Sequence, residues 1–188
     1  FVYNGQSGST YSYTMSGNGF IGDGATFNDL MYIPKDRAEM DLMSFPTNGA
    51  LTETIQKDQF EEFIKSDKYM SKNRGKFAER NGARAPFTNI VDANIQQDFS
   101  VNVGKVQHTL SLRFDIFNLT NLIDKNAGRQ YFFNFDQAQV IQVVNFTGNK
   151  PNYRFNKPVD NKVGVISDGV SAFNSSRWNG QVTVRYSF

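Results

Sequence analysis

Apolar and polar residues alternate along the last stretch of the chain, residues 178–188. One set of alternate positions holds aromatic, aliphatic or small residues: Trp178, Gly180, Val182, Val184, Tyr186 and Phe188. The positions between them, from Asn179 to Ser187, are all polar. Because successive side chains of a strand point to opposite faces, this period of two predicts a strand with one apolar face and one polar face.

Two further segments, residues 87–101 and 106–116, alternate in the same way, and only residues 102–105 separate them. A connection this short predicts an antiparallel hairpin in which Gly104 supplies the backbone angles of the turn. A hairpin centred near Val103 and Gly104 has these cross-strand neighbours: Phe99 with His108, Ile95 with Leu112, and Asn94 with Arg113. A shift of two residues would change the partners but not the faces.

Long connections lie on either side of this hairpin. They contain only short pieces with the character of strands, at residues 30–33, 130–135 and 140–146. One short helix is predicted over Gln59–Ser66, where Asp58 and Glu61 form a capping box.

Connections of this length are uncommon in a compact soluble domain, whereas the order long, short, long is typical of outer-membrane barrels. The pattern predicts four parts: an extracellular loop at 5–85, a β-hairpin at 86–118, an extracellular loop at 119–176, and a closing strand at 177–188. It also places the C-terminus in the periplasm.

Composition narrows the class of protein only slightly. The 188 residues include 18 Phe and 8 Tyr, yet the mean hydropathy is −0.50 and the net charge is +2. No apolar run approaches the roughly 18 residues that a membrane-spanning helix needs. Barrel strands alternate in polarity, so a barrel can be polar on average. The near-neutral charge gives no indication of a nucleic-acid partner, and we expect none.

Cysteine is absent from the chain, which excludes disulfides and thiolate metal sites. His108 is the only histidine, so neither a histidine cluster nor a Ser-His-Asp triad can be built within the chain. We therefore expect no catalytic residue, no metal and no cofactor. The chain lacks an initiator Met and a signal peptide, and we expect it to be a C-terminal piece of a longer protein.

Several segments resemble a known family: FIKSDKYMSKNRGKFAERNGARAPF, the strand ending in QQDF, LRFDIFNLTNLIDKNAGRQYF and SRWNGQVTVRYSF. Together they resemble the C-terminal part of TonB-dependent outer-membrane receptors of Bacteroidetes. Within these receptors the chain is most similar to the Oar-like group, whose members carry an N-terminal carboxypeptidase-regulatory-like domain. The resemblance covers residues 1–5 and 57–188.

This resemblance implies an all-β fold, the last strands of a 22-stranded antiparallel transmembrane β-barrel with long extracellular loops and one short loop helix. It implies a bacterial outer-membrane location and TonB-dependent active transport of a substrate that the sequence does not identify. The implied partners are outer-membrane lipid and lipopolysaccharide, the barrel-assembly machinery, TonB through a plug outside this chain, and other outer-membrane or surface proteins. The assembly machinery would read Tyr186 and Phe188.

Charged and polar side chains supply two further sets of candidate residues. The polar faces of the predicted strands carry residues expected to face the barrel lumen: Asp92, Asn94, Asp98, Arg113, Asp115 and Arg185. The first loop is acidic over residues 23–62 and carries a basic cluster beyond them: Lys72, Arg74, Lys76, Arg80 and Arg84. The two halves of this loop either pair with each other or contact an anionic substrate, lipopolysaccharide or a partner protein.

Two alternatives remain open from the sequence. An outer-membrane barrel could serve an adhesive or structural role through its surface loops, without import. A soluble β-rich binding domain is the other alternative, and charges placed on the apolar face of the strands would distinguish it from a barrel.

Overall fold

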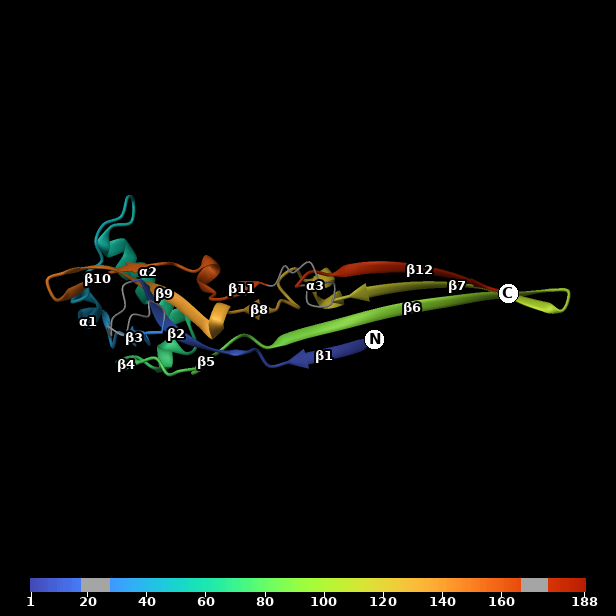
Figure 1. Cartoon of the computed structure of the whole chain (residues 1–188), viewed down its shortest axis with the longest axis horizontal. Coiled ribbons are helices and arrows are strands. Elements are labelled where there is room, and N and C mark those ends of the chain that lie inside the picture. The colour runs from blue at the N-terminus through green and yellow to red at the C-terminus, as the bar shows by residue number, and fades with distance from the viewer. Residues whose placement is uncertain (18–27, 167–175) are drawn as a thin grey trace. The chain divides into compact units, whose positions relative to one another are not determined.

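The computed structural model describes residues 1–17, 28–166 and 176–188. Strands make up 48% of the structure and helices are few, so the fold class is all-β, as predicted. The chain divides into two compact units (Figure 1). We call residues 1–8, 86–132 and 166–188 the sheet unit, and residues 9–85 and 133–165 the core unit. Parts of both predicted loops, residues 18–27 and 167–175, lie outside the described residues.

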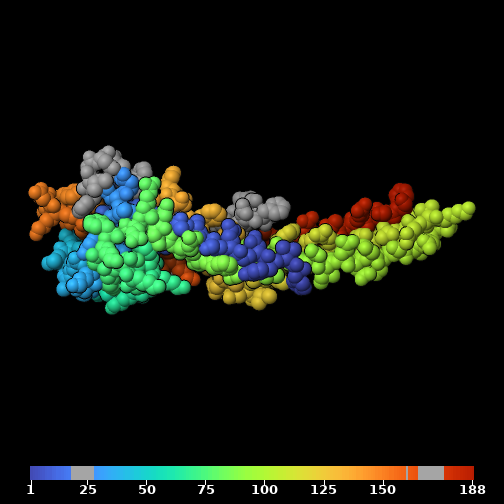
Figure 2. All heavy atoms as spheres, turned by 90° about the horizontal axis from the view of Figure 1, so that it is seen from below, coloured from blue at the N-terminus to red at the C-terminus, as the bar shows by residue number. Residues whose placement is uncertain are grey.

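Four antiparallel strands form the sheet unit, in the order β1-β6-β7-β12. Their bounds are Val2–Gln6 for β1, Thr88–Val103 for β6, Val106–Phe117 for β7 and Asn179–Ser187 for β12. A short helix α3 (Leu119–Ile123) and strand β8 (Tyr131–Phe132) follow β7. The predicted hairpin and the predicted closing strand are therefore confirmed as strands. The hairpin tip is uncovered on the face seen in Figure 2.

The register of the hairpin differs by two residues from the prediction. The observed partners are Phe99 with Leu110, Ile95 with Phe114, and Asn94 with Asp115. Val103 pairs with Val106, so the turn consists of Gly104 and Lys105 alone, with Gly104 at a φ of 67°. Because the shift is an even number of residues, every side chain stays on its predicted face.

The core unit contains a four-stranded sheet in the order β10-β9-β2-β5, in which β2 and β9 are parallel. Its strands are β2 (Thr10–Gly17), β5 (Ala83–Arg84), β9 (Gln137–Thr147) and β10 (Lys150–Phe155). A smaller pair joins β3 (Tyr32–Ile33) to β4 (Lys76–Phe77). Strand β11 (Val165–Ile166) lies where the sequence passes between the units.

Reading residues 10–17 and 150–155 as plain connection was wrong, because they form β2 and β10. The middle of β2 is buried without interruption from Tyr11 to Met15. Its sequence nevertheless alternates, with Tyr11, Tyr13 and Met15 placed between the polar residues Ser12, Thr14 and Ser16, so the period-two rule that identified the other strands applies to β2 as well. The pieces expected near 30–33, 130–135 and 140–146 correspond to β3, β8 and β9.

The described part of the core unit has two α-helices, α1 (Arg37–Asp41) and α2 (Glu53–Ser66), together with 3₁₀ turns at Met70–Lys72, Asn134–Asp136 and Val159–Asn161. The predicted end of α2 is confirmed, but the predicted start was wrong by six residues. Thr52 caps the helix, with its hydroxyl accepting from the Ile55 N–H. Among the described residues, no helix is both long and apolar enough to cross a membrane.

Aromatic side chains from α2 and the sheet fill the centre of the core unit. Phe60 and Phe63 are fully buried, and their ring centroids lie 5.1 and 5.8 Å from that of Phe155 on β10. The Phe45 ring centroid lies 6.3 Å from that of Phe60. Burying rings of this size is the main favourable contribution available to a domain of these dimensions.

A buried chain of hydroxyl groups joins β2 to the end of α2. The Tyr13 hydroxyl donates to the Asp67 carboxylate at 2.8 Å and lies 3.2 Å from the Tyr11 hydroxyl. Asp67 also accepts from the backbone N–H groups of Tyr69 and Met70. Burial raises the pKa of Tyr11 to about 12, and burial next to Tyr11 and Asp67 raises the pKa of Tyr13 further. Both phenols therefore stay neutral in the folded state.

We expect Phe60→Ala to destabilise the core unit by about 3–5 kcal/mol, because it removes a fully buried ring and leaves a cavity. The measurement is the urea concentration at which residues 9–85 of the full chain become susceptible to protease. Phe77→Ala is the control, because that ring is 60% exposed and should cost far less. Equal midpoints for the two variants would contradict this account of the core.

The neutral phenols also predict an alkaline limit to the stability of the core unit. A folded-state pKa above the unfolded value of about 10 contributes stability that is complete below that pH. This stability is lost as the pH rises through the folded pKa of Tyr11, about 12. Between about pH 10 and pH 12, the urea concentration at the unfolding midpoint should fall as the absorbance of tyrosinate appears. The double variant Tyr11→Phe, Tyr13→Phe should flatten the fall, and an unchanged slope would contradict the assignment.

Candidate functional site

The sheet unit presents an apolar face on which side chains from three strands form continuous rows. Two such rows are Ile95, Phe114 and Val182, and Phe99, Leu110 and Tyr186. Val184 lies beside Leu112 between these rows. These side chains are open to the surroundings, with 73% exposure at Ile95, 68% at Val182 and 63% at Val184. Contiguous apolar surface of this kind marks a contact with lipid, protein or ligand.

The opposite face of the same sheet is polar from Asp92 and Asp115 to the hairpin turn, whereas Val2, Ile90 and Phe117 lie on it near or beyond the other end of these rows. Its rows include Asn94, Asp115 and Gln181, then Gln96, Arg113 and Thr183, then Asp98, Ser111 and Arg185. Strand alternation thus gathers all six residues predicted to face a lumen onto one face: Asp92, Asn94, Asp98, Arg113, Asp115 and Arg185. That this face borders a lumen stays a prediction.

One ion pair on this polar face joins two residues of β7. The Arg113 guanidinium donates to the Asp115 carboxylate at 2.6 Å, although the two residues lie on the same strand. Asp115 is only 7% exposed, and a buried carboxylate needs such a partner.

An aromatic group lies where β12 ends beside the hairpin. The His108 Nδ1 atom and the Tyr186 hydroxyl are 2.5 Å apart, and their ring centroids are separated by 5.9 Å. The Phe188 ring lies 6.4 Å from His108 and 5.8 Å from Tyr186. Trp178, at the other end of β12, is 46% exposed. Aromatic residues with polar atoms therefore bracket the aliphatic part of this strand.

Asn118 closes the opposite end of the hairpin in a left-handed conformation, with φ 57° and ψ 54°. Its backbone N–H donates to the Asp92 carboxylate at 2.7 Å, and its side-chain amide donates to the Gly128 carbonyl at 2.9 Å. Its side-chain oxygen accepts from the Thr120 hydroxyl and the Asn121 N–H. Asp92 therefore fixes the point at which β7 leaves the sheet.

The predicted basic cluster spreads over several elements of the core unit. Arg74 pairs with Glu61 through two hydrogen bonds of 2.8 and 3.2 Å, which joins the acidic and basic halves of the predicted loop. Lys76 lies on β4, Arg84 lies on β5, and Lys72 is exposed in the 3₁₀ turn after α2. Arg80 lines a cavity.

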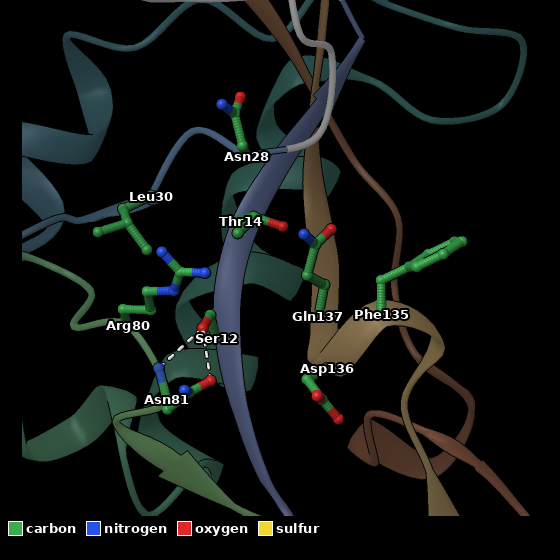
Figure 3. Close-up of a pocket in the computed structure, with 9 residues that line it drawn as sticks. All are labelled: Ser12, Thr14, Asn28, Leu30, Arg80, Asn81, Phe135, Asp136 and Gln137. Carbon is green, nitrogen blue, oxygen red and sulfur yellow. Dashed lines mark hydrogen bonds between the residues drawn. The ribbon is translucent and has the colours of Figure 1, made fainter.

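This cavity lies within the core unit and has a volume of about 490 Å³. Residues of β2, of the segments before β3 and β5, and of the turn before β9 line it (Figure 3). Sequence reasoning found Arg80 but missed its neighbours, which are Ser12, Thr14, Asn81, Phe135, Asp136 and Gln137. They come from three distant segments and form no motif along the chain.

Among the described residues, no group of three or more His, Cys, Asp or Glu side chains is placed to hold a metal ion. Comparison of the chain with known protein families, with curated proteins and with solved structures found no match. The fold and the sites therefore rest on the geometry described above, which defines an all-β protein with a two-faced antiparallel sheet.

We expect Asn118→Gly to lower the free energy of unfolding by about 1–3 kcal/mol, because the buried hydrogen-bond partners of the Asn118 side chain are left unsatisfied. Asn118→Ala should lower the free energy of unfolding by about 1 kcal/mol more, because the left-handed backbone conformation is unfavourable for alanine and not for glycine. Amide hydrogen exchange at residues 119–123 measures both effects. Equal protection in the two variants would show that the backbone conformation contributes nothing.

Proposed function

We propose that the four-stranded sheet is part of the wall of a bacterial outer-membrane β-barrel, with its apolar face toward lipid and its polar face toward the lumen. The observation that carries this proposal is the separation of side chains between two faces that are both largely open. In water the apolar rows would be unfavourable by about 25 cal/mol for each Å² left exposed. Lipid removes this cost, and a wet lumen accepts the polar rows.

The dimensions of β12 support the same proposal. Tyr186 comes eight positions after Trp178, which corresponds to about 27 Å along a strand at roughly 3.4 Å per residue. A tilt of about 40° reduces this span to about 20 Å, close to the lipid-facing band of about 25 Å in outer-membrane barrels. The aromatic residues at its two ends would then lie in the two membrane interfaces.

The unpaired edges of the sheet are consistent with a larger barrel. In the order β1-β6-β7-β12, strands β1 and β12 each have one neighbour among the described strands. Exposed edges invite aggregation, and closure into a barrel removes them. The proposal pairs both edges with further strands of a 22-stranded wall.

We further propose that this barrel belongs to a TonB-dependent active transporter of the Oar-like group. Support for transport comes from the resemblance of segments 63–87, 112–132 and 176–188 to that group. The long connections on either side of the hairpin, which contain the core unit, would then be extracellular, as the resemblance implies. Tyr186 and Phe188 would signal to the barrel-assembly machinery, and TonB would act through a plug.

Adjacent residues on β12 offer a matched test of the membrane proposal in the complete protein that contains this chain. Val184→Lys puts a charge on the apolar face, and Thr183→Lys puts the same charge on the polar face. Near the membrane midplane, Val184→Lys should destabilise the folded barrel by about 2–4 kcal/mol, and Thr183→Lys should destabilise it far less.

The measurement is the fraction of protein in the outer membrane that keeps the heat-modifiable gel mobility of a folded barrel. We expect Val184→Lys to lower this fraction strongly and Thr183→Lys to leave it near that of the unmodified protein. A soluble, folded Val184→Lys protein would refute the barrel.

A further inference from the structure

We propose that the cavity of the core unit is a binding site for a neutral saccharide. Its volume of about 490 Å³ falls within the range of about 300–1,000 Å³ usual for small-molecule sites. This inference goes beyond the proposed function and does not depend on it, because every lining residue belongs to the core unit.

A buried hydroxyl without a partner points to a missing ligand. Thr14 lines the cavity and is only 2% exposed, yet its Oγ1 atom has no hydrogen-bond partner among the described residues. Figure 3 shows this hydroxyl turned toward Gln137. Buried polar atoms are nearly always satisfied, and each exception needs an explanation. A ligand hydroxyl reaching Thr14 would both donate and accept, which suits a threonine hydroxyl.

The charges that line the cavity cancel. Arg80 and Asp136 supply one positive and one negative group, and neither side chain has an ion pair with another described residue. The remaining polar groups are neutral amides and hydroxyls, including Asn81 and Gln137. Guanidinium, carboxylate and amide groups are planar and can each engage two adjacent hydroxyls of one ligand. This composition fits a neutral molecule with many hydroxyls better than an ion.

A strained turn presents an aromatic ring at the cavity. Phe135 and Asp136 both have a φ of 54°, a conformation that bulky side chains rarely adopt. The Phe135 ring is 89% exposed, so burial of the ring does not explain the strain. Figure 3 shows the ring on the side of Gln137 opposite to Thr14 and directed away from both. Strain of this kind gathers at ligand-binding sites, where it is held by the surrounding structure.

The surrounding structure does hold this turn in place. Phe133, two residues earlier, is buried and stacks on Tyr11 with ring centroids 3.8 Å apart. The Asp136 N–H donates to the Phe133 carbonyl at 3.2 Å. The exposed ring is therefore presented before any ligand arrives, and its flat apolar face can stack against the C–H face of a sugar ring.

The test is binding of the purified complete protein to an array of neutral oligosaccharides, namely malto-, cello-, xylo-, chito- and manno-oligosaccharides. The dipeptide Gly-Gly serves as a zwitterionic probe for the Arg80 and Asp136 pair. We expect at least one oligosaccharide to bind. Phe135→Ala and Gln137→Ala should each weaken that binding about fivefold or more. Phe146→Ala on β9, whose ring is 44% exposed outside the cavity lining, should leave it unchanged.

Thr14→Val separates a binding role from a structural one. Valine keeps the shape of threonine and removes the unsatisfied hydroxyl, so the urea midpoint should hold or rise while saccharide binding weakens at least threefold. Absence of oligosaccharide binding, equal binding by all variants, or binding of Gly-Gly alone would overturn the inference. Failure of the Val184→Lys test would leave these binding results unaffected, so the two proposals can fail separately.

Discussion

The two-residue turn at Gly104 and Lys105 fixes the register of β6 with β7. This register decides which side chains of the two strands share a face, and the rest of the sheet unit depends on it. Because Val103 pairs with Val106, the aliphatic residues of β6 and β7 fall on one side and the charged residues on the other. Strand β12 adds its own alternation to β7 in matching register, and β1 pairs with β6. A turn with one residue more or fewer would mix the two faces, since the side-chain period of a strand is two. The apolar rows, the polar rows and the aromatic group at His108 all depend on this register.

The core unit is stabilised in another way. Its stability comes from rings that α2 packs against β10 and from the hydroxyl chain between Tyr13 and Asp67. This packing anchors the elements around the cavity, since Tyr11 lies on β2 and its ring stacks on Phe133. The same interactions thus stabilise the unit and hold the Phe135 turn in a conformation that it would not adopt alone.

The two units present surfaces of different polarity. The sheet unit offers a broad apolar face, which makes sense against a solvent as apolar as lipid. The core unit offers a polar cavity with balanced charge, which suits a dissolved ligand with many hydroxyls. Neither proposal is evidence for the other, because the two rest on separate residues.

The sequence by itself determined the amphipathic strands, their faces and the helix around Phe60, because these follow from local periodicity. It placed Asp92, Arg113 and Asp115 on one face although the predicted register was wrong by two residues. Only the tertiary structure decided the burial of β2 on both faces, the parallel pairing of β2 with β9, and the cavity. The pairing of strands far apart in the chain and a cavity built from distant segments leave no spacing in the sequence, because contacts across the fold alone bring such residues together.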